Sequence, residues 1–332
     1  MRLPQIGTLL LSTMFVGPAI GDDPKPGDRL ERRGDEIVVC GQLIHTTTPV
    51  KLWTDPGGYD AYRLDHRFGP ADQPTSRTEK SEDLKPLRRF GTRRVELSPD
   101  QREQVRGGGW DLPLLQSVVD QFVIHFDACG TSQKCFEVLH DQRGLSVQFM
   151  LDLDGTIYQT LDLKEGAWHA TKANGRSIGI EIANIGTFTD PGSDRVTRWY
   201  KNDEAGKTRI DLPDPSIVPT YSTGSAPLRP IRDRPVSGQV QGEELSQYDL
   251  TPQQYDALIK LTATLCKTFP KLKCDYPRDA QGSLIPRKLD DEAYDHYSGI
   301  LGHYHVQLNK VDPGPAFQWD RLLDGVKQAM KD

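Results

Sequence analysis

Two histidines and one aspartate lie in sequence contexts that suit metal-assisted hydrolysis. Near the C-terminus, His303 follows the apolar run Gly299-Ile300-Leu301, which predicts a buried strand with His303 at its end. Asp312 comes soon after, and the turn Pro313-Gly314-Pro315 restricts the backbone there. A histidine and a carboxylate brought together by a rigid turn can provide two of the three protein ligands of a catalytic zinc ion, whose fourth position is open to water.

The third ligand is predicted far upstream, at His125. The apolar run Phe122-Val123-Ile124 also predicts a strand, and His125 again lies at its end. Site residues of α/β folds tend to collect at such strand ends. The two histidines therefore have the same sequence context, although they are far apart in the chain.

The composition limits the class of protein. A chain of 332 residues can form one domain of roughly 200 residues with additions. Its 41 Lys and Arg residues against 47 Asp and Glu residues give a net charge of −6, which lacks the broad basic surface of a nucleic-acid binder. The 24 prolines and 30 glycines indicate long, interrupted loops around the core.

Residues 1–21 are predicted to be a signal peptide. Arg2 provides the positive start, an apolar run extends from Ile6 to Val16, and Ala19-Ile20-Gly21 offers small residues for cleavage. An N-terminus that is disordered or packs into the core is the alternative. The apolar run is too short for a permanent membrane span, so we expect a secreted or periplasmic protein with no membrane span in the mature chain.

The five cysteines suit an oxidising compartment, where disulfides persist. Cys129 and Cys135 flank a short loop after His125, and Cys266 and Cys274 flank the end of a predicted helix. Local pairing of each couple would leave Cys40 unpaired, although sequence alone does not determine connectivity. A zinc site made of cysteines is a competing interpretation, but it lacks the usual two-residue spacings.

Both strands and helices are predicted along the chain. Strands are predicted at 122–125, 147–152, 156–159, 177–183 and 299–301, and helices at 252–265 and 317–330. Asp154-Gly155 indicates a hairpin turn. Thr251 and Pro252 form a typical helix start.

Glu181 is a single carboxylate within an otherwise apolar strand, which calls for an explanation.

The chain is predicted to have three parts, of which the signal peptide at 1–21 is the first. Residues 22–112 follow the signal peptide as a β-rich N-terminal extension and linker, and residues 113–332 form the catalytic domain. Two loop-rich insertions are expected within that domain, at about 190–247 and 277–295, because Pro, Gly and charges abound there without sustained periodicity.

Several short motifs, in this order, resemble the zinc-dependent N-acetylmuramoyl-L-alanine amidases of the type 2 amidase family, which share a fold with the peptidoglycan recognition proteins. The resemblance covers roughly Phe122 to Met330, less the two loop-rich insertions, and it implies an α/β fold with a central mixed β-sheet flanked by helices. The motifs are Val123-Ile124-His125, Asp154-Gly155-Thr156-Ile157-Tyr158-Gln159, Ala167-Trp168-His169-Ala170, Ser177-Ile178-Gly179-Ile180-Glu181, Gly302-His303, and Lys310-Val311-Asp312-Pro313-Gly314-Pro315 followed by Phe317 and Trp319.

The resemblance implies a secreted amidohydrolase that cuts the amide between N-acetylmuramic acid and L-alanine in peptidoglycan or muropeptides. It implies one Zn²⁺ and no organic cofactor, with His125, His303 and Asp312 as ligands. Cys129 and Cys135 also look like the small disulfide loop of the recognition proteins.

The remaining site residues receive roles from the same resemblance. Glu181 is expected to act as general base and then general acid, and Lys310 to stabilise the oxyanion. A strand-edge charge is the alternative for Glu181, and a solvated side chain is the alternative for Lys310. Tyr158 can donate a hydrogen bond in the site or simply pack, and His169 can bind substrate or orient a metal ligand.

The chain departs from the family pattern at two places. Phe126-Asp127 stands where the family often has a second histidine or a threonine. Tyr304-His305-Val306 stands where an acidic residue and a proline are usual, so His305 is a rival to His303; in a strand, residues two apart share a face.

Two other functions are compatible with these residues. One is a peptidoglycan-binding module without catalysis, and the other is a structural protein whose metal holds the fold. Chelation should unfold the structural protein, but should stop cleavage by the amidase with the fold largely intact.

Overall fold

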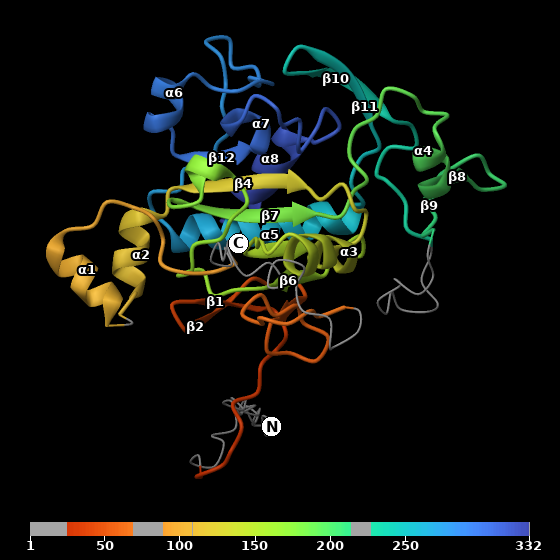
Figure 1. Cartoon of the computed structure of the whole chain (residues 1–332). Coiled ribbons are helices and arrows are strands. Elements are labelled where there is room, and N and C mark those ends of the chain that lie inside the picture. The colour runs from red at the N-terminus through yellow and green to blue at the C-terminus, as the bar shows by residue number, and fades with distance from the viewer. Residues whose placement is uncertain (1–24, 69–88, 108, 214–226, 332) are drawn as a thin grey trace, which may run out of the picture. The chain divides into compact units, whose positions relative to one another are not determined.

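A six-stranded mixed sheet forms the centre of the unit Arg33–Asp332 (Figure 1). All neighbouring strands are parallel except the hairpin of β5 and β6, which is antiparallel as its Asp154-Gly155 turn predicts. In sheet order, the strands are β12 (Gly299–Gly302), β4 (Gln121–Phe126), β7 (Ser177–Ile182), β5 (Phe149–Leu151), β6 (Ile157–Gln159) and β3 (Val50–Leu52). This sheet, with helices against it, confirms the predicted α/β fold.

The computed structural model describes residues 25–68, 89–107, 109–213 and 227–331. The predicted signal peptide at 1–21 lies outside the described residues. Contacts divide the chain into the units Met1–Arg32 and Arg33–Asp332, and every feature below belongs to the second. In the described part of the chain, no helix combines the length and the apolar composition that crossing a membrane requires.

The helices and the small sheets complete the set of elements. The helices are α1 (Pro99–Arg106), α2 (Leu112–Val118), α3 (Ser132–Phe136), the π-helix η1 (Glu137–Gln142), the 3₁₀-helix η2 (Thr171–Ala173), α4 (Asp194–Trp199), α5 (Pro252–Thr268), α6 (Asp291–His296), α7 (His303–Val306) and α8 (Trp319–Ala329). The antiparallel pairs are β1 (Glu36–Val39) with β2 (Gln42–His45), β8 (Tyr200–Asn202) with β9 (Thr208–Ile210), and β10 (Val236–Val240) with β11 (Glu243–Gln247).

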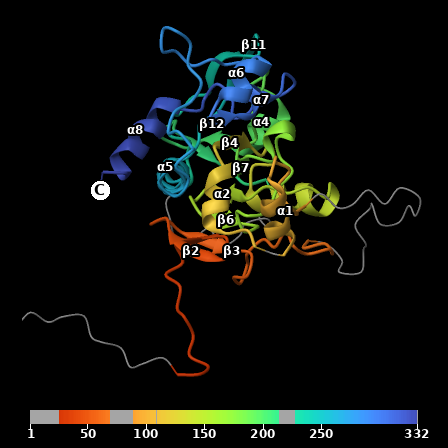
Figure 2. The ribbon, with the colours of Figure 1, turned by 90° about the vertical axis from the view of Figure 1, so that its left-hand side faces the viewer.

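The largest hydrophobic core lies between one face of the sheet and the helices α5 and α8 (Figures 1 and 2). Helix α5 begins where the sequence predicts, because the Thr251 side chain accepts from the Gln254 backbone N–H and Gln254 returns the bond to the Thr251 backbone. Phe122 and Ile124 of β4 belong to this core. Since strand neighbours point to opposite faces, His125 lies on the other face of the sheet.

The N-terminal region contributes to this sheet. β3 pairs in parallel with β6 and forms the edge strand, so Val50 and Leu52 belong to the main core. The predicted extension and linker at 22–112 is described again from Arg89 onward, and there it packs on the catalytic domain: Arg93 is buried and bonds to carbonyl groups of three other residues.

Both insertions that were expected to be loop-rich contain helices or strands. The insertion at 190–247 contains α4 and two hairpins. The sequence did not predict these elements because the strands are short and their hydrophobic periodicity is weak. The insertion at 277–295 contains most of α6. His140 of η1 is buried, and its ring nitrogens are both satisfied: Nδ1 contacts Asp141 and Nε2 contacts the Arg63 carbonyl.

One of the two expected disulfides is present. Cys266 and Cys274 are bonded and tie the last turn of α5 to the loop that follows. Cys129 and Cys135 are free thiols, and the neighbouring Cys135 thiol lowers the pKa of Cys129. Cys40 is also free.

Candidate active site

His125 and Glu181 lie side by side on neighbouring parallel strands. His125 is the fifth residue of β4, Glu181 is the fifth of β7, and the two are direct register partners. Ile178, Ile180 and Ile182 of β7 face the main core, so alternation places Glu181 on the same face of the sheet as His125. The hydrophobic pattern of the two strands therefore fixes this pair.

His303 and Asp312 are brought together by the chain reversal after β12. The predicted strand ends at Gly302, and His303 begins the short helix α7. Gly302 is required for the close approach of the turn, because a Cβ there would lie 2.6 Å from Cδ of Pro313. The Tyr304 backbone N–H donates to the Asp312 carbonyl at 3.2 Å, which ties the returning chain to α7.

Three ligand atoms converge on one point. Nδ1 of His125 lies 2.8 Å from Oδ2 of Asp312 and 3.0 Å from Nδ1 of His303, and the third side of the triangle is also 3.0 Å. All three side chains are buried. Together they form one of the two groups of His and carboxylate ligand atoms, among the described residues, that could hold a metal ion.

The hydrogen bonds made by Nε2 of His303 and by Nε2 of His125 leave Nδ1 of each ring unprotonated and directed at the shared point. Oε1 of Gln307 can only accept, so Nε2 of His303, at 2.5 Å, carries the proton and Nδ1 keeps its lone pair. Nε2 of His125 contacts Nδ1 of His169 at 3.1 Å, and Nε2 of His169 contacts Oγ of Ser177 at 3.3 Å. These contacts are satisfied when each Nε2 donates, which leaves Nδ1 of His125 unprotonated.

The donor set fits a divalent cation. Two lone pairs and a carboxylate oxygen at 2.8 to 3.0 Å from one another would repel, and a cation between them relieves that repulsion. Burial, together with the neighbouring His303, lowers the pKa of His125 to about 4, against the opposing effect of Asp312. Burial would raise the pKa of Asp312, but the two histidines outweigh it and hold that pKa below its usual value. At neutral pH, His125 is therefore neutral and Asp312 is charged.

His305, the rival candidate, points away from this cluster. It lies in α7 rather than in a strand, so residues two apart do not share a face. Its Nδ1 accepts from the Gly302 backbone N–H and its Nε2 donates to the Ile285 carbonyl, both at 2.8 Å. Both ring nitrogens are used in the fold, and His305 has no nitrogen left for a ligand.

A cavity of about 220 Å³ opens beside the three ligand residues. Glu181, Lys310 and His169 line it, together with Asp127, Cys129, Arg143 and Trp168. Burial and the nearby carboxylate of Asp312 raise the pKa of Glu181 well above its usual value, with Lys310 opposing the shift. A carboxylate, a cation and a metal-binding cluster thus face one space, which is the arrangement that amide hydrolysis needs.

Tyr158 does not line this cavity. Its ring stacks on Tyr59 with centroids 4.2 Å apart, inside a separate hydrophobic cluster with Phe136 and Met150. The packing interpretation of Tyr158 therefore fits the structure, and the substrate-binding interpretation does not. The reason is register: Tyr158 pairs across the hairpin with Met150 and is covered by Tyr59 from the N-terminal region, whose position the sequence did not predict.

Asp127 is a site residue that the motif comparison did not assign. It lines the cavity, and its Oδ1 accepts from the backbone N–H groups of Cys129, Gly130 and Asn184 at 2.9, 2.9 and 3.1 Å. Burial raises the pKa of Asp127 well above its usual value. The available signal was the departure Phe126-Asp127 from the family pattern. Gln307, which orients His303, had no signal in the sequence.

Comparison with known proteins identifies one family. Residues 115–315 match the family model described as N-acetylmuramoyl-L-alanine amidase, which is more than half of the chain. No curated protein matches the sequence significantly.

Three similar solved structures are amidases or related proteins of low identity. One is the N-acetylmuramyl-L-alanine amidase AmiD from E. coli, solved in complex with the substrate anhydro-N-acetylmuramic acid-L-Ala-D-gamma-Glu-L-Lys. Its sequence is 17% identical to this chain, and the TM-score is 0.33. The match covers 62% of this chain and only 57% of that one. The endolysin amidase LysCS from Clostridium intestinale URNW is 17% identical, with a TM-score of 0.33 over 64% of this chain and 86% of its own. A selenomethionine derivative of AmpD is 16% identical, with a TM-score of 0.29, and the match covers 63% of this chain and 86% of that one. These TM-scores do not establish the fold, which rests on the strand order of the sheet.

Proposed function

This chain belongs to the N-acetylmuramoyl-L-alanine amidase family, and from that membership we propose that it is a zinc-dependent hydrolase of the amide between N-acetylmuramic acid and L-alanine in peptidoglycan. The observation that carries the proposal is the convergence of Nδ1 of His125, Nδ1 of His303 and Oδ2 of Asp312 beside Glu181 and Lys310. A binding module would have no need of a buried carboxyl group at this point.

His125, His303 and Asp312 would hold the zinc ion. Two imidazoles and one carboxylate are a known catalytic donor set that leaves a fourth position for solvent. Zinc bound there supplies a water of lowered pKa and polarises the substrate carbonyl. The chain itself supplies the orientation of the ligands through Gln307 and His169.

Glu181 is the proposed general base. Its position opposite His125 in the register brings its carboxyl group to the cavity in which water and the scissile amide would meet. Glu181 accepts the proton of the attacking water and then donates it to the departing amine of L-alanine. The Lys310 ammonium faces the same cavity and stabilises the oxygen that becomes negative when the carbonyl is attacked.

His169 is a positioning residue in this proposal. It contacts Nε2 of His125 and fixes that ring, so the orienting alternative from the sequence has a geometric basis. Its own ring is buried, and burial lowers its pKa well below the usual value, which keeps His169 neutral as the acceptor for His125.

Replacement of Gln307 by leucine is expected to weaken zinc binding by about 10- to 100-fold, because Nε2 of His303 loses the acceptor that fixes its tautomer. Competition titration with a zinc chelator measures the change. Gln281→Leu is the matched control, since Gln281 is exposed and lies in a loop that does not contribute to the cavity. Equal affinities for the Gln307 and Gln281 variants would contradict the role given to Gln307.

The proposed reaction is tested on a muropeptide such as the one named in the AmiD complex. The purified protein should contain about one zinc ion per chain and release the peptide from the sugar. Chelation should stop the release while the circular dichroism spectrum remains; unfolding on chelation would favour a structural metal instead. Binding of the muropeptide by zinc-loaded protein without any release would favour the recognition module.

We also propose that the protein works outside the cytoplasm, in the periplasm or the medium, where peptidoglycan is accessible. The basis is the signal-like sequence of residues 1–21, together with the Cys266–Cys274 disulfide, which suits an oxidising compartment. Cell fractionation with N-terminal sequencing tests this: cytoplasmic protein that retains residues 1–21 would contradict it.

A further inference from the structure

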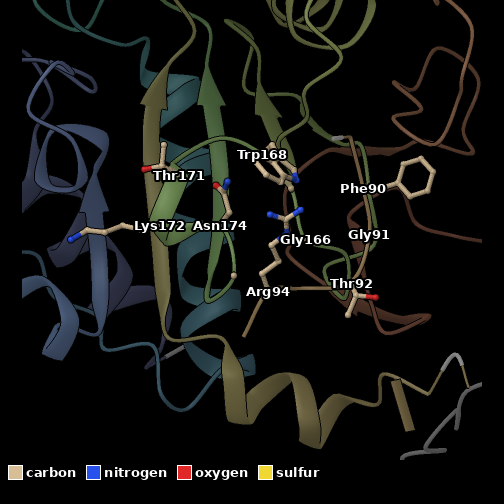
Figure 3. Close-up of a pocket in the computed structure, with 11 residues that line it drawn as sticks. Phe90, Gly91, Thr92, Arg94, Gly166, Trp168, Thr171, Lys172 and Asn174 are labelled. Atoms are coloured by element: carbon tan, nitrogen blue, oxygen red, sulfur yellow. The ribbon is translucent and has the colours of Figure 1, made fainter. Parts of the chain in front are cut away.

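A second cavity has a volume of about 400 Å³, and Figure 3 shows the residues that line it. One wall is the segment Phe90 to Arg94, and the other is formed by Gly166 to Trp168 and the η2 turn with Asn174 and Gly175. Trp168 lines this cavity and the catalytic cavity alike. Trp168 is therefore the boundary that the two cavities share, which places the second space next to the one that His125 and Glu181 line.

The wall from Phe90 to Arg94 lies outside the residues that match the family model, which begin at 115. Four of the eleven lining residues, Phe90, Gly91, Thr92 and Arg94, thus come from a part of the chain that family membership does not explain. Any selectivity that this wall provides belongs to this chain and is not given by the family match.

The wall is held in a fixed position. The buried guanidinium of Arg93 donates to the carbonyl groups of Leu163, Gly175 and Ser177 at 2.7 to 3.1 Å. The Gly166 backbone N–H donates to the Gly91 carbonyl at 2.8 Å. A Cβ at Gly175 would lie 2.2 Å from the carbonyl oxygen of Arg94, so glycine is needed there for the two walls to meet.

Because Arg93 points into the protein, Arg94 points out into the cavity. Its guanidinium lies over the Trp168 ring, 4.7 Å from the centroid, as Figure 3 shows. No described carboxylate forms an ion pair with Arg94. Stacking fixes the plane of the guanidinium and leaves its N–H groups available, which is the geometry used to bind a carboxylate through two hydrogen bonds.

The rest of the lining contains no acid, and its neutral polar side chains are Thr92, Thr171 and Asn174. None of the residues that line the cavity is Asp or Glu. Oδ1 of Asn174 is occupied by the backbone N–H groups of His169 and Ala170, so its amide N–H₂ remains as the donor. Lys172 extends away from the cavity and pairs with Asp291 at 2.9 Å, which leaves Arg94 as the cation for a ligand.

We propose that this second cavity binds a free carboxylate of the peptide stem, with Arg94 as the residue that selects it. The proposal rests on the proposed amidase function, since it assumes that the stem begins at the scissile amide in the catalytic cavity. A glutamate linked through its γ-carboxyl group keeps its α-carboxylate free, and the stem also ends in a carboxylate. A neutral glycan would be served by the threonine hydroxyl groups alone and would not need a guanidinium without an ion-pair partner.

The test compares Arg94→Gln, Arg94→Lys and wild type on two muropeptides, one with free stem carboxylates and one with those groups converted to amides. Arg106→Gln is the control, because Arg106 is an exposed arginine of the nearby helix α1 that does not line the cavity. Arg94→Gln is expected to raise KM for the acidic substrate by about tenfold and to change kcat by less than about twofold. Arg94→Lys should retain part of the preference.

Calorimetric binding of the acidic muropeptide to each variant, made in the Glu181→Gln background, separates this inference from the proposed reaction. Arg94-dependent binding without cleavage by wild type would support the cavity and contradict the amidase. An equal loss for acidic and amidated substrates, or no loss in Arg94→Gln relative to Arg106→Gln, would overturn the role of Arg94. Thermal denaturation verifies that all variants are folded.

Discussion

Replacement of Glu181 by glutamine should lower kcat for muropeptide cleavage by about 10²- to 10⁴-fold, the usual contribution of a positioned general base. Glutamine keeps the size of the side chain but cannot accept a proton from water. Because Glu181 does not belong to the triangle of ligand atoms, the zinc content should stay at the wild-type level. Activity falls in this variant while metal and fold remain.

Steady-state kinetics with metal analysis on the same preparations measures this effect. Glu244→Gln is a matched control, because Glu244 is an exposed glutamate on β11 that does not line the catalytic cavity. Full activity in the Glu181 variant would remove the proposed base. Loss of zinc together with activity would show instead that Glu181 serves the metal site.

The pair His303→Ala and His305→Ala should separate the ligand from its neighbour. Loss of His303 removes one of the three convergent atoms, so zinc affinity should fall by more than the roughly 10- to 100-fold that loss of an outer partner costs. Cleavage at limiting zinc should fall with it. The fold should persist, because α7 is held by hydrogen bonds that His303 does not make through its side chain.

His305→Ala should have the opposite profile. It leaves the Gly302 backbone N–H and the Ile285 carbonyl without their side-chain partner and opens a cavity in the core, which should lower the free energy of unfolding by about 2 to 4 kcal/mol. Zinc affinity of the folded protein should change little. Zinc titration and urea denaturation of both variants measure the two effects, and zinc loss in His305→Ala alone would reverse the assignment.

The sequence predicts the strands that carry the site because their signals are local. The apolar runs that end at His125 and at Gly302 each form a buried strand, and the parallel register of β4 with β7 places Glu181 opposite His125. The family prediction is confirmed by the match over 115–315. The ligand and catalytic roles of these residues stay predictions that the geometry supports.

Features that depend on distant parts of the chain were not predictable in the same way. Tyr158 lies in a motif, but its ring is covered by Tyr59, about 100 residues away in the chain, and no local pattern shows that contact. β3 joins the sheet next to β6, although about 100 residues of the chain separate the two strands. The position of Arg94 likewise depends on the long-range bonds of Arg93 and so becomes visible only in the folded chain.

The most direct test is the location of zinc in a crystal of the metal-loaded protein, by anomalous scattering at the zinc edge. We expect one strong peak within about 2.0 to 2.2 Å of Nδ1 of His125, Nδ1 of His303 and Oδ2 of Asp312. The peak should border the cavity that Glu181 and Lys310 line. A peak bound to His305, or no peak between His125 and Asp312 at full zinc loading, would contradict the proposed enzyme.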